Sequence, residues 1–83
     1  FMGGDVGNAE LFDALWAALK PGGRFVANAV TLDGEAALLD RLEQKGGDLA
    51  RIDVSHLDHV GAHKVLRPKM TVTQWSIVKK ADE

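Results

Sequence analysis

The chain has 83 residues, 46% hydrophobic and 27% charged, which is the composition of an ordinary globular protein. Its formal net charge of −2, with 10 Lys and Arg scattered among 12 Asp and Glu, gives no basic surface for nucleic acid or anionic lipid. The lack of cysteine excludes disulfides and thiolate metal sites, and no apolar stretch approaches the roughly 20 residues of a membrane helix, so we expect a cytoplasmic chain without a nucleic-acid or membrane partner.

The first residues predict the end of a strand followed by a helix. An apolar pair at residues 1–2 precedes Gly3-Gly4, as at the end of a strand that runs into a turn. Asn8 is a suitable N-cap, and Glu10 favours the first turn of a helix. The apolar residues that follow recur at helical spacing: Leu11, Phe12, Leu15, Trp16 and Leu19. Residues 20–23, Lys-Pro-Gly-Gly, end this helix.

The central part of the chain predicts a buried strand and a second helix. Residues 24–30 form a nearly continuous apolar run, which is typical of a strand buried on both faces in a parallel sheet. Residues 31–34 lead into a helix of about 35–45 that ends at Gly46-Gly47. We expect its buried face to comprise Ala36, Leu38, Leu39 and Leu42, and its charged residues to stay in water: Glu35, Asp40, Arg41, Glu43 and Lys45.

The last third predicts two strands joined by a polar loop. Residues 48–57 alternate apolar and polar, which indicates a more exposed strand. We expect a loop over residues 58–70, a final strand over residues 71–79 and a polar tail.

This order of elements predicts an α/β fold. Strands that alternate with helices favour a parallel sheet, but the final strand follows its predecessor without a helix and must therefore be antiparallel. Three main strands, the last antiparallel, and two helices match the C-terminal half of a Rossmann-like class I methyltransferase sheet, whose closing strand lies between its two predecessors. We expect residues 1–83 to be part of one such domain, too short to work alone.

Three segments carry a resemblance to a known family. Residues 10–24, with Leu-Lys-Pro-Gly-Gly before a buried strand, resemble class I methyltransferases in general. The segment Asn-Ala-Val-Thr-Leu-Asp at residues 28–33 is similar to the precorrin-6Y C5,15-methyltransferase family, in its decarboxylating, C15-methylating domain. Residues 67–75, with Pro68, Met70 and Gln74-Trp75, resemble the closing segment of that domain.

The resemblance implies methyl transfer from S-adenosylmethionine to a precorrin carbon, coupled to loss of the carboxyl group of an acetate side chain, in cobalamin biosynthesis. The activated donor needs alignment rather than a metal or a covalent nucleophile. The Gly-rich loop and the acidic residue that hold the cofactor in this fold are not found in the 83 residues, so we expect the cofactor to be bound mainly by another part of the domain.

The candidate site residues follow the carboxyl ends of the parallel strands, where open α/β sheets bind ligands. Gly3 and Gly4 are candidates for contact with the cofactor, and Gly4 also with the substrate. Asn28, polar in an apolar strand, is the candidate catalytic residue, because its amide could orient an acetate, a propionate or a pyrrole N–H. The further candidates for substrate binding are Ala29, Val30, Thr31, Arg67 and Met70.

Simpler structural roles stand beside these assignments. The Gly3-Gly4 pair could simply form a tight turn, and the amide of Asn28 could form hydrogen bonds with backbone groups of a neighbouring loop. Arg67 could be a solvated charge in a loop. Trp16 and Trp75 suit the core. We expect His56, His59 and His63 to be solvated loop residues that form no metal site. Asp33 and Glu35 are expected to be helix-start carboxylates.

A second hypothesis comes from another class of protein. The chain would then be a non-catalytic α/β interaction module without activity of its own, and a strand followed by a Gly-x-Gly loop upstream of Phe1 would argue for the methyltransferase instead. A dehydrogenase fits less well, because the last strand is antiparallel. We also expect self-association, because residues 24–30 would expose an apolar strand edge.

Overall fold

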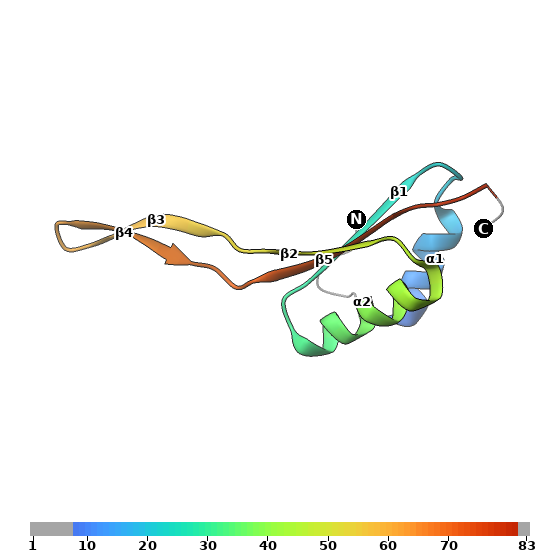
Figure 1. Ribbon diagram of the computed structural model, residues 1–83, viewed down its shortest axis with the longest axis horizontal. Coiled ribbons are helices and arrows are strands. Elements are labelled where there is room, and N and C mark those ends of the chain that lie inside the picture. The colour runs from blue at the N-terminus through green and yellow to red at the C-terminus, as the bar shows by residue number, and fades with distance from the viewer. Residues whose placement is uncertain (1–7, 82–83) are drawn as a thin grey trace.

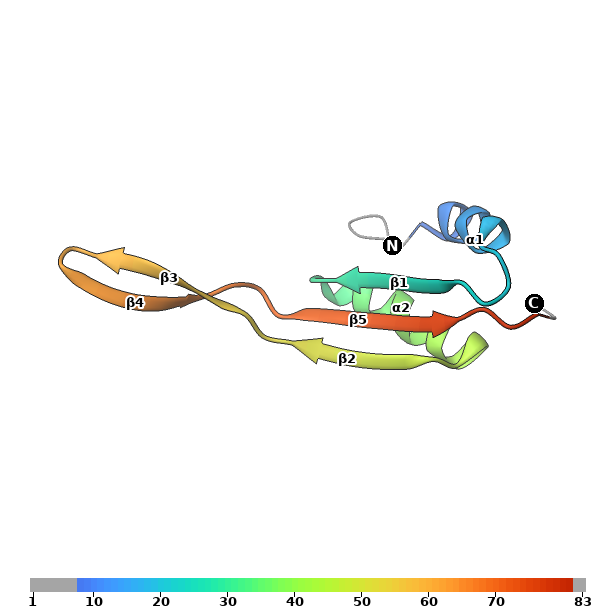
Figure 2. The same ribbon diagram turned by 90° about the horizontal axis from the view of Figure 1, so that it is seen from above.

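The computed structural model describes residues 8–81, which form two layers and a projecting hairpin (Figures 1 and 2). Two helices pack on one face of a three-stranded sheet, and the hairpin extends along the strand direction, so that the molecule is 57 Å long. The elements in chain order are α1 (Ala9–Ala18), β1 (Arg24–Ala29), α2 (Leu32–Lys45), β2 (Asp48–Ile52), β3 (Ser55–Val60), β4 (His63–Pro68) and β5 (Val72–Val78).

The three-stranded sheet has the order β1-β5-β2, with β5 antiparallel to both neighbours. Asn28 lies opposite Gln74 on β5, and Ala50 of β2 lies opposite Gln74 on the other side. The closing strand therefore lies between its two predecessors, and β1 and β2 run parallel to each other. This confirms the topology expected from the sequence.

The core lies between the sheet and the helices. Phe12 and Trp16 of α1 pack against Phe25 of β1 and Trp75 of β5, with ring centroids 5.2 to 6.5 Å apart. Trp75 is fully buried and its indole N–H donates to the carbonyl of Gly46 at 2.9 Å, which joins the end of α2 to the sheet. Since buried aromatic pairs contribute beyond their area, these rings stabilise the packing of α1 on the sheet. The core positions predicted for both tryptophans are confirmed.

The helix ends follow the capping residues in the sequence. The side chain of Asn8 accepts from the backbone N–H of Leu11, and that of Thr31 accepts from Gly34, both at 3.0 Å. Thr31 thus starts α2 three residues before the predicted position 35, and Gly46 ends it at a φ of 75°.

The buried face of α2 differs from the prediction. Ala36 and Leu39 are exposed, whereas Leu38 is fully buried. Arg41 and Lys45 were expected in water but are half-buried, and they stack over the rings of Phe12 and Trp16 at 4.2 and 4.5 Å. Long cationic side chains can cover apolar surface while their charged ends meet an aromatic face. This explains why Arg41 and Lys45 are half-buried.

The segment from residue 55 to 68 corrects the predicted loop. It is an antiparallel hairpin of β3 and β4, here called the hairpin arm, and the strand predicted over 48–57 is divided into β2 and β3. Gly61, at a φ of 60°, opens a two-residue turn that suits a hairpin. Both faces of this ribbon are exposed to solvent, so its polar composition does not distinguish a strand from a loop. Leu57 and Leu66 face each other across it and are 62% and 72% exposed.

One edge of β1 pairs with β5, and no strand between residues 8 and 81 pairs with its other edge. The strand is also less enclosed than predicted. Phe25, Ala27 and Ala29 are buried under the helices, but Val26 and Asn28 on the opposite face are only half-buried. The sheet face away from the helices is therefore not covered by either of the described helices (Figure 2).

Candidate functional site

An open hollow lies at the carboxyl end of β1, where ligands bind in open α/β sheets. Its volume is about 380 Å³, and four elements meet around it: the end of β1, the start of α2, the end of β2 and the start of β5. The residues that line it are Val30, Leu32, Glu35, Arg51, Thr71 and Thr73. This end of the sheet also leads into the hairpin arm (Figure 2).

A polar group is fixed at the base of this hollow by the strand register. Thr73 lies opposite Ala29 on one side and opposite Arg51 on the other, so the three residues form one row across the sheet. Glu35, in the first turn of α2, accepts from the Thr73 hydroxyl and from Arg51 Nη2, each at 2.8 Å. These bonds, the one from Thr73 first, lower the pKa of Glu35 below its usual range. The carboxylate therefore stays ionised and holds the guanidinium in place.

Apolar side chains flank this polar group. Val30 is 48% exposed and Leu32 is 84% exposed, although both belong to apolar residue types that pack well inside proteins. Their position at the mouth of the hollow gives it one apolar side and one charged side. Such a site suits an amphipathic ligand.

Asn28 lies on the opposite face of the sheet from Ala29 and Thr73, because side chains alternate along β1. Its side-chain oxygen accepts from Gln74 Nε2 at 2.9 Å, and both residues are half-buried. No acceptor for the side-chain nitrogen of Asn28 lies within residues 8–81, and the bond to Gln74 sets the direction of this nitrogen. The structure thus supplies an orienting partner, and the catalytic role of Asn28 stays a prediction.

The neighbouring candidates use their side chains for the fold. The methyl group of Ala29 belongs to the core, and Thr31 uses its hydroxyl to cap α2. Of these three residues, Val30 lines the hollow. Contact of a substrate with Ala29 or Thr31 would therefore involve mainly the backbone.

Arg67 and Met70 lie away from the core of the sheet. Arg67 is on β4, where it faces His56 and donates from Nε to Asp58 at 2.6 Å. This bond, followed by one from the His59 backbone N–H, lowers the pKa of Asp58. Met70 follows the arm and is 70% exposed, next to Thr71 of the hollow. Gly3 and Gly4 lie outside the described residues.

The three histidines are all exposed and belong to the hairpin arm rather than to a loop. Within residues 8–81, no three His, Cys, Asp or Glu side chains are grouped in a way that could hold a metal ion. None of the helices in the described part of the chain is long and apolar enough to cross a membrane.

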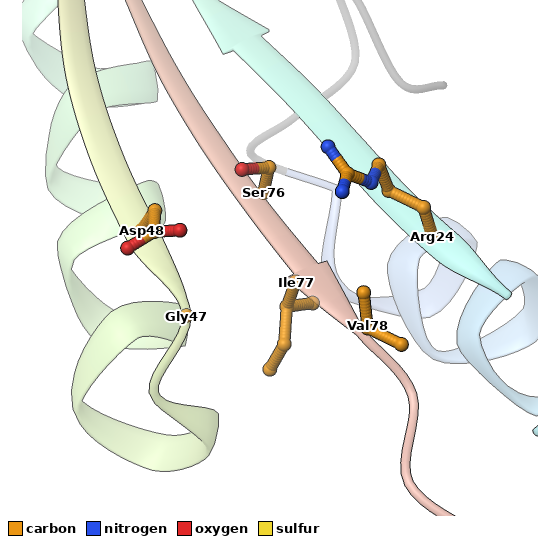
Figure 3. A pocket seen from close by; sticks show the side chains of 6 residues that line it. All are labelled: Arg24, Gly47, Asp48, Ser76, Ile77 and Val78. Carbon is orange, nitrogen blue, oxygen red and sulfur yellow. The ribbon is translucent and has the colours of Figure 1, made fainter. Parts of the chain in front are cut away.

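A second hollow lies at the other end of the sheet, near the start of β1 (Figure 3). It is smaller, about 110 Å³, and is lined by Arg24, Gly47, Asp48, Ser76, Ile77 and Val78. Gly47 has a φ of 98°, and a Cβ there would lie 2.6 Å from the carbonyl oxygen of Ser76. Two backbones thus approach closely beside this hollow, which lies at the amino end of β1 and away from the expected ligand side.

The arrangement of Glu35, Arg51 and Thr73 was not predicted from the sequence. Their separation of 16 and 38 residues from one another carries no local signal. The order β1-β5-β2 places Arg51 beside Thr73, and Glu35 reaches both from the first turn of α2.

Glycine turns let a backbone approach a cofactor closely, and open α/β sheets bind their ligands at the carboxyl ends of the strands. The glycines with positive φ among residues 8–81 lie in the turn before β1, in the turn before β2 and at the tip of the arm: Gly22, Gly46, Gly47 and Gly61. None of them is at the carboxyl end of β1.

Comparison with known proteins identifies relatives over nearly the whole chain. Residues 1–79 match the family model described as precorrin methyltransferase domain. A precorrin-6Y C(5,15)-methyltransferase [decarboxylating] of Sinorhizobium sp is 47% identical over 79 residues, which are 95% of this chain and 19% of that protein. The protein of the same description from Mycobacterium tuberculosis is 40% identical over 80 residues, 96% of this chain and 20% of its own length. The chain thus spans about one fifth of these relatives.

Two solved structures share the fold. One is described as a precorrin-6Y C5,15-methyltransferase targeted domain from Corynebacterium diphtheriae; it has a TM-score of 0.82 and 39% identity, over 93% of this chain and 46% of that one. The other is the C-terminal domain of precorrin-6Y C5,15-methyltransferase from Rhodobacter capsulatus, with a TM-score of 0.69 and 38% identity, over 84% of this chain and 38% of that one. The present fold therefore corresponds to less than half of each of these domains.

Proposed function

The chain belongs to the precorrin methyltransferase domain family, and from this we propose that it forms the acceptor-binding part of a decarboxylating precorrin methyltransferase in cobalamin biosynthesis. The single observation that carries the proposal is the hollow at the carboxyl end of β1, which combines apolar side chains with a fixed guanidinium. A precorrin has an apolar ring and a periphery of acetate and propionate groups, and both features find a counterpart in this hollow.

S-adenosylmethionine, when bound, would supply a methyl group that is already activated for transfer. The residues of this chain would then act by position. Val30 and Leu32 would contact the ring, and Asn28, with its amide oriented by Gln74, would direct an acceptor group on the other face of β1. Orientation of this kind can account for a large part of a rate enhancement without any chemical group of the protein taking part. Gly3, Gly4, Arg67 and Met70 remain predicted contacts.

The test is an assay of the natural protein that contains the chain, with methyl-labelled S-adenosylmethionine and a precorrin. The expected product has gained at least one methyl group from the donor and lost the mass of one carbon dioxide. A protein that binds the methyl donor but leaves the precorrin unchanged would contradict the proposal and favour a non-catalytic interaction module.

We also propose that the 83-residue chain self-associates. Two observations support this: one edge of β1 has no partner strand within residues 8–81, and the hairpin arm exposes Leu57 and Leu66. Free strand edges and clustered apolar side chains are both sites of association. Sedimentation at tens of micromolar should detect dimers or larger species, and a monomer would contradict the proposal. A cytoplasmic location stays a prediction from the lack of cysteine.

A further inference from the structure

Arg51 has free hydrogen-bonding capacity in the hollow at the carboxyl end of β1. A guanidinium carries five N–H donors in a planar fork. One of them, on Nη2, donates to Glu35, and no other acceptor for Arg51 lies within residues 8–81. The side chain is 61% exposed and lines the hollow, so its other donors are accessible to a ligand.

The position of this guanidinium is set before any ligand arrives. Glu35 holds it at 2.8 Å, and Thr73 holds the second oxygen of Glu35 at the same distance. Arg51 and Thr73 are in turn fixed as a pair by the register of β2 and β5. A cation whose rotamer is already restricted loses less entropy when it binds an anion, and the planar fork matches the two oxygens of a carboxylate.

The other arginine considered for substrate binding is less suited to this role. Arg67 lies on the hairpin arm and directs its Nε to Asp58 of the same arm. Its partner across the ribbon, His56, is exposed, and Arg67 does not line the hollow at the carboxyl end of β1. Arg51, in contrast, shares its hollow with the apolar side chains of Val30 and Leu32.

We propose that Arg51 binds a carboxylate on the periphery of the tetrapyrrole while Val30 and Leu32 contact its ring, an inference that rests on the proposed function. Glu35 is then a positioning residue: it aims the guanidinium but does not touch the ligand. Thr73 acts one step further away, through Glu35.

A purely structural salt bridge makes a different prediction from a carboxylate-binding arginine. If the pair only stabilised the fold, removal of either partner would have the same effect. If Arg51 binds the ligand, Arg51→Met should weaken binding strongly, whereas Glu35→Gln should weaken it little, because the glutamine amide oxygen can still accept from Arg51 and a competing negative charge is removed. The two variants therefore separate the explanations.

The experiment titrates a porphyrin octacarboxylate into the natural protein that contains the chain and follows porphyrin fluorescence. We expect Arg51→Met to raise the Kd at least about tenfold, which corresponds to about 1.4 kcal/mol. Arg51→Lys should recover part of the loss, because it keeps the charge but not the fork. The matched control is Arg24→Met, which removes an arginine from the hollow at the opposite end of the sheet and should leave the Kd unchanged.

An unchanged Kd in Arg51→Met, or an equal loss in Arg51→Met and Glu35→Gln, would overturn the proposal. The affinity for S-adenosylmethionine is measured in each variant and should not change, which shows that the domain remains folded. If the wild-type protein methylates a precorrin while Arg51→Met binds the porphyrin normally, the role of Arg51 fails and the proposed function stands. If the wild-type protein neither binds the porphyrin nor methylates a precorrin, both fail.

Discussion

The ammonium group of Lys79, just beyond β5, donates to the backbone carbonyl of Trp16 in α1 at 2.8 Å. A second bond reaches the carbonyl of Leu19 at 2.9 Å, and the side chain also lies over the Trp16 ring. These carbonyls lie at the carboxyl end of α1, where the helix dipole favours a positive charge; the Trp16 carbonyl also accepts from the Leu19 backbone N–H at 3.2 Å. The end of the chain is thereby joined to its first helix over 63 residues.

We predict that Lys79→Met lowers the free energy of unfolding by about 2 kcal/mol, because it leaves two carbonyls without a charged donor in a buried place. Lys79 is only 5% exposed, so water cannot easily replace the ammonium group. Urea denaturation measures the change. Lys80→Met, at the exposed next position, is the control and should change stability by less than about 0.5 kcal/mol.

Gly47 is predicted to tolerate no side chain. Gly47→Ala would place its Cβ against the Ser76 carbonyl in a backbone conformation that L-residues avoid, so we expect a loss above about 2 kcal/mol. Gly61→Ala is the control, because Gly61 also has a positive φ but has open space around it, and it should cost about 1 kcal/mol. Thermal unfolding compares the two variants. Equal effects would show that strain in φ, not the close contact, determines the cost.

Stability should fall on acidification because of Glu35. Its folded-state pKa is lowered, by Thr73 first and Arg51 second, so its contribution is present above the ordinary glutamate pKa of about 4.3 and is lost as the pH falls through the lower folded value. Denaturation at several pH values measures the free energy of unfolding of the wild type and of Glu35→Gln. The two free energies should differ near pH 7 and become equal in acid. Thr73→Val should reduce the difference, and a difference that does not change with pH would contradict this account.

Asn28 can be tested against its partner Gln74. If Asn28 only pairs with Gln74, then Asn28→Ala and Gln74→Ala should alter stability equally and leave turnover unchanged. We predict instead that Asn28→Ala lowers the kcat of the natural protein about tenfold or more, which corresponds to about 1.4 kcal/mol in the activation free energy. The free energy of unfolding should change by less than this. Unchanged turnover would remove Asn28 from the site.

The parts of the fold that depend on local chemistry could be predicted from the sequence. Asn8 caps α1, Gly46 ends α2, and the lack of a helix before the last strand required β5 to be antiparallel. The hairpin arm could not be predicted, because a ribbon that is wet on both faces has the composition of a loop. The stacking of Arg41 on Phe12 depends on how two helices meet, which a pattern within one helix does not contain.

The candidate site divides in the same way. Val30 was placed correctly at the carboxyl end of β1 because the end of a strand can be located from its apolar run. Arg51, the ligand contact proposed above, was not a candidate from the sequence because its place beside Thr73 arises from the order of the strands. In an exposed strand with alternating apolar and polar residues, the polar residues are ordinarily solvated. The sequence does not show which of these polar residues lines a hollow.

The central claim is that the acceptor binds at the carboxyl end of β1, and amide hydrogen exchange of the natural protein with and without a porphyrin octacarboxylate tests it most directly. The account predicts slower exchange in peptides that cover residues 28–35 and 71–73, around the hollow that contains Arg51. Protection of residues 47–48 and 76–78 at the other hollow, with no change at the carboxyl end of β1, would contradict it.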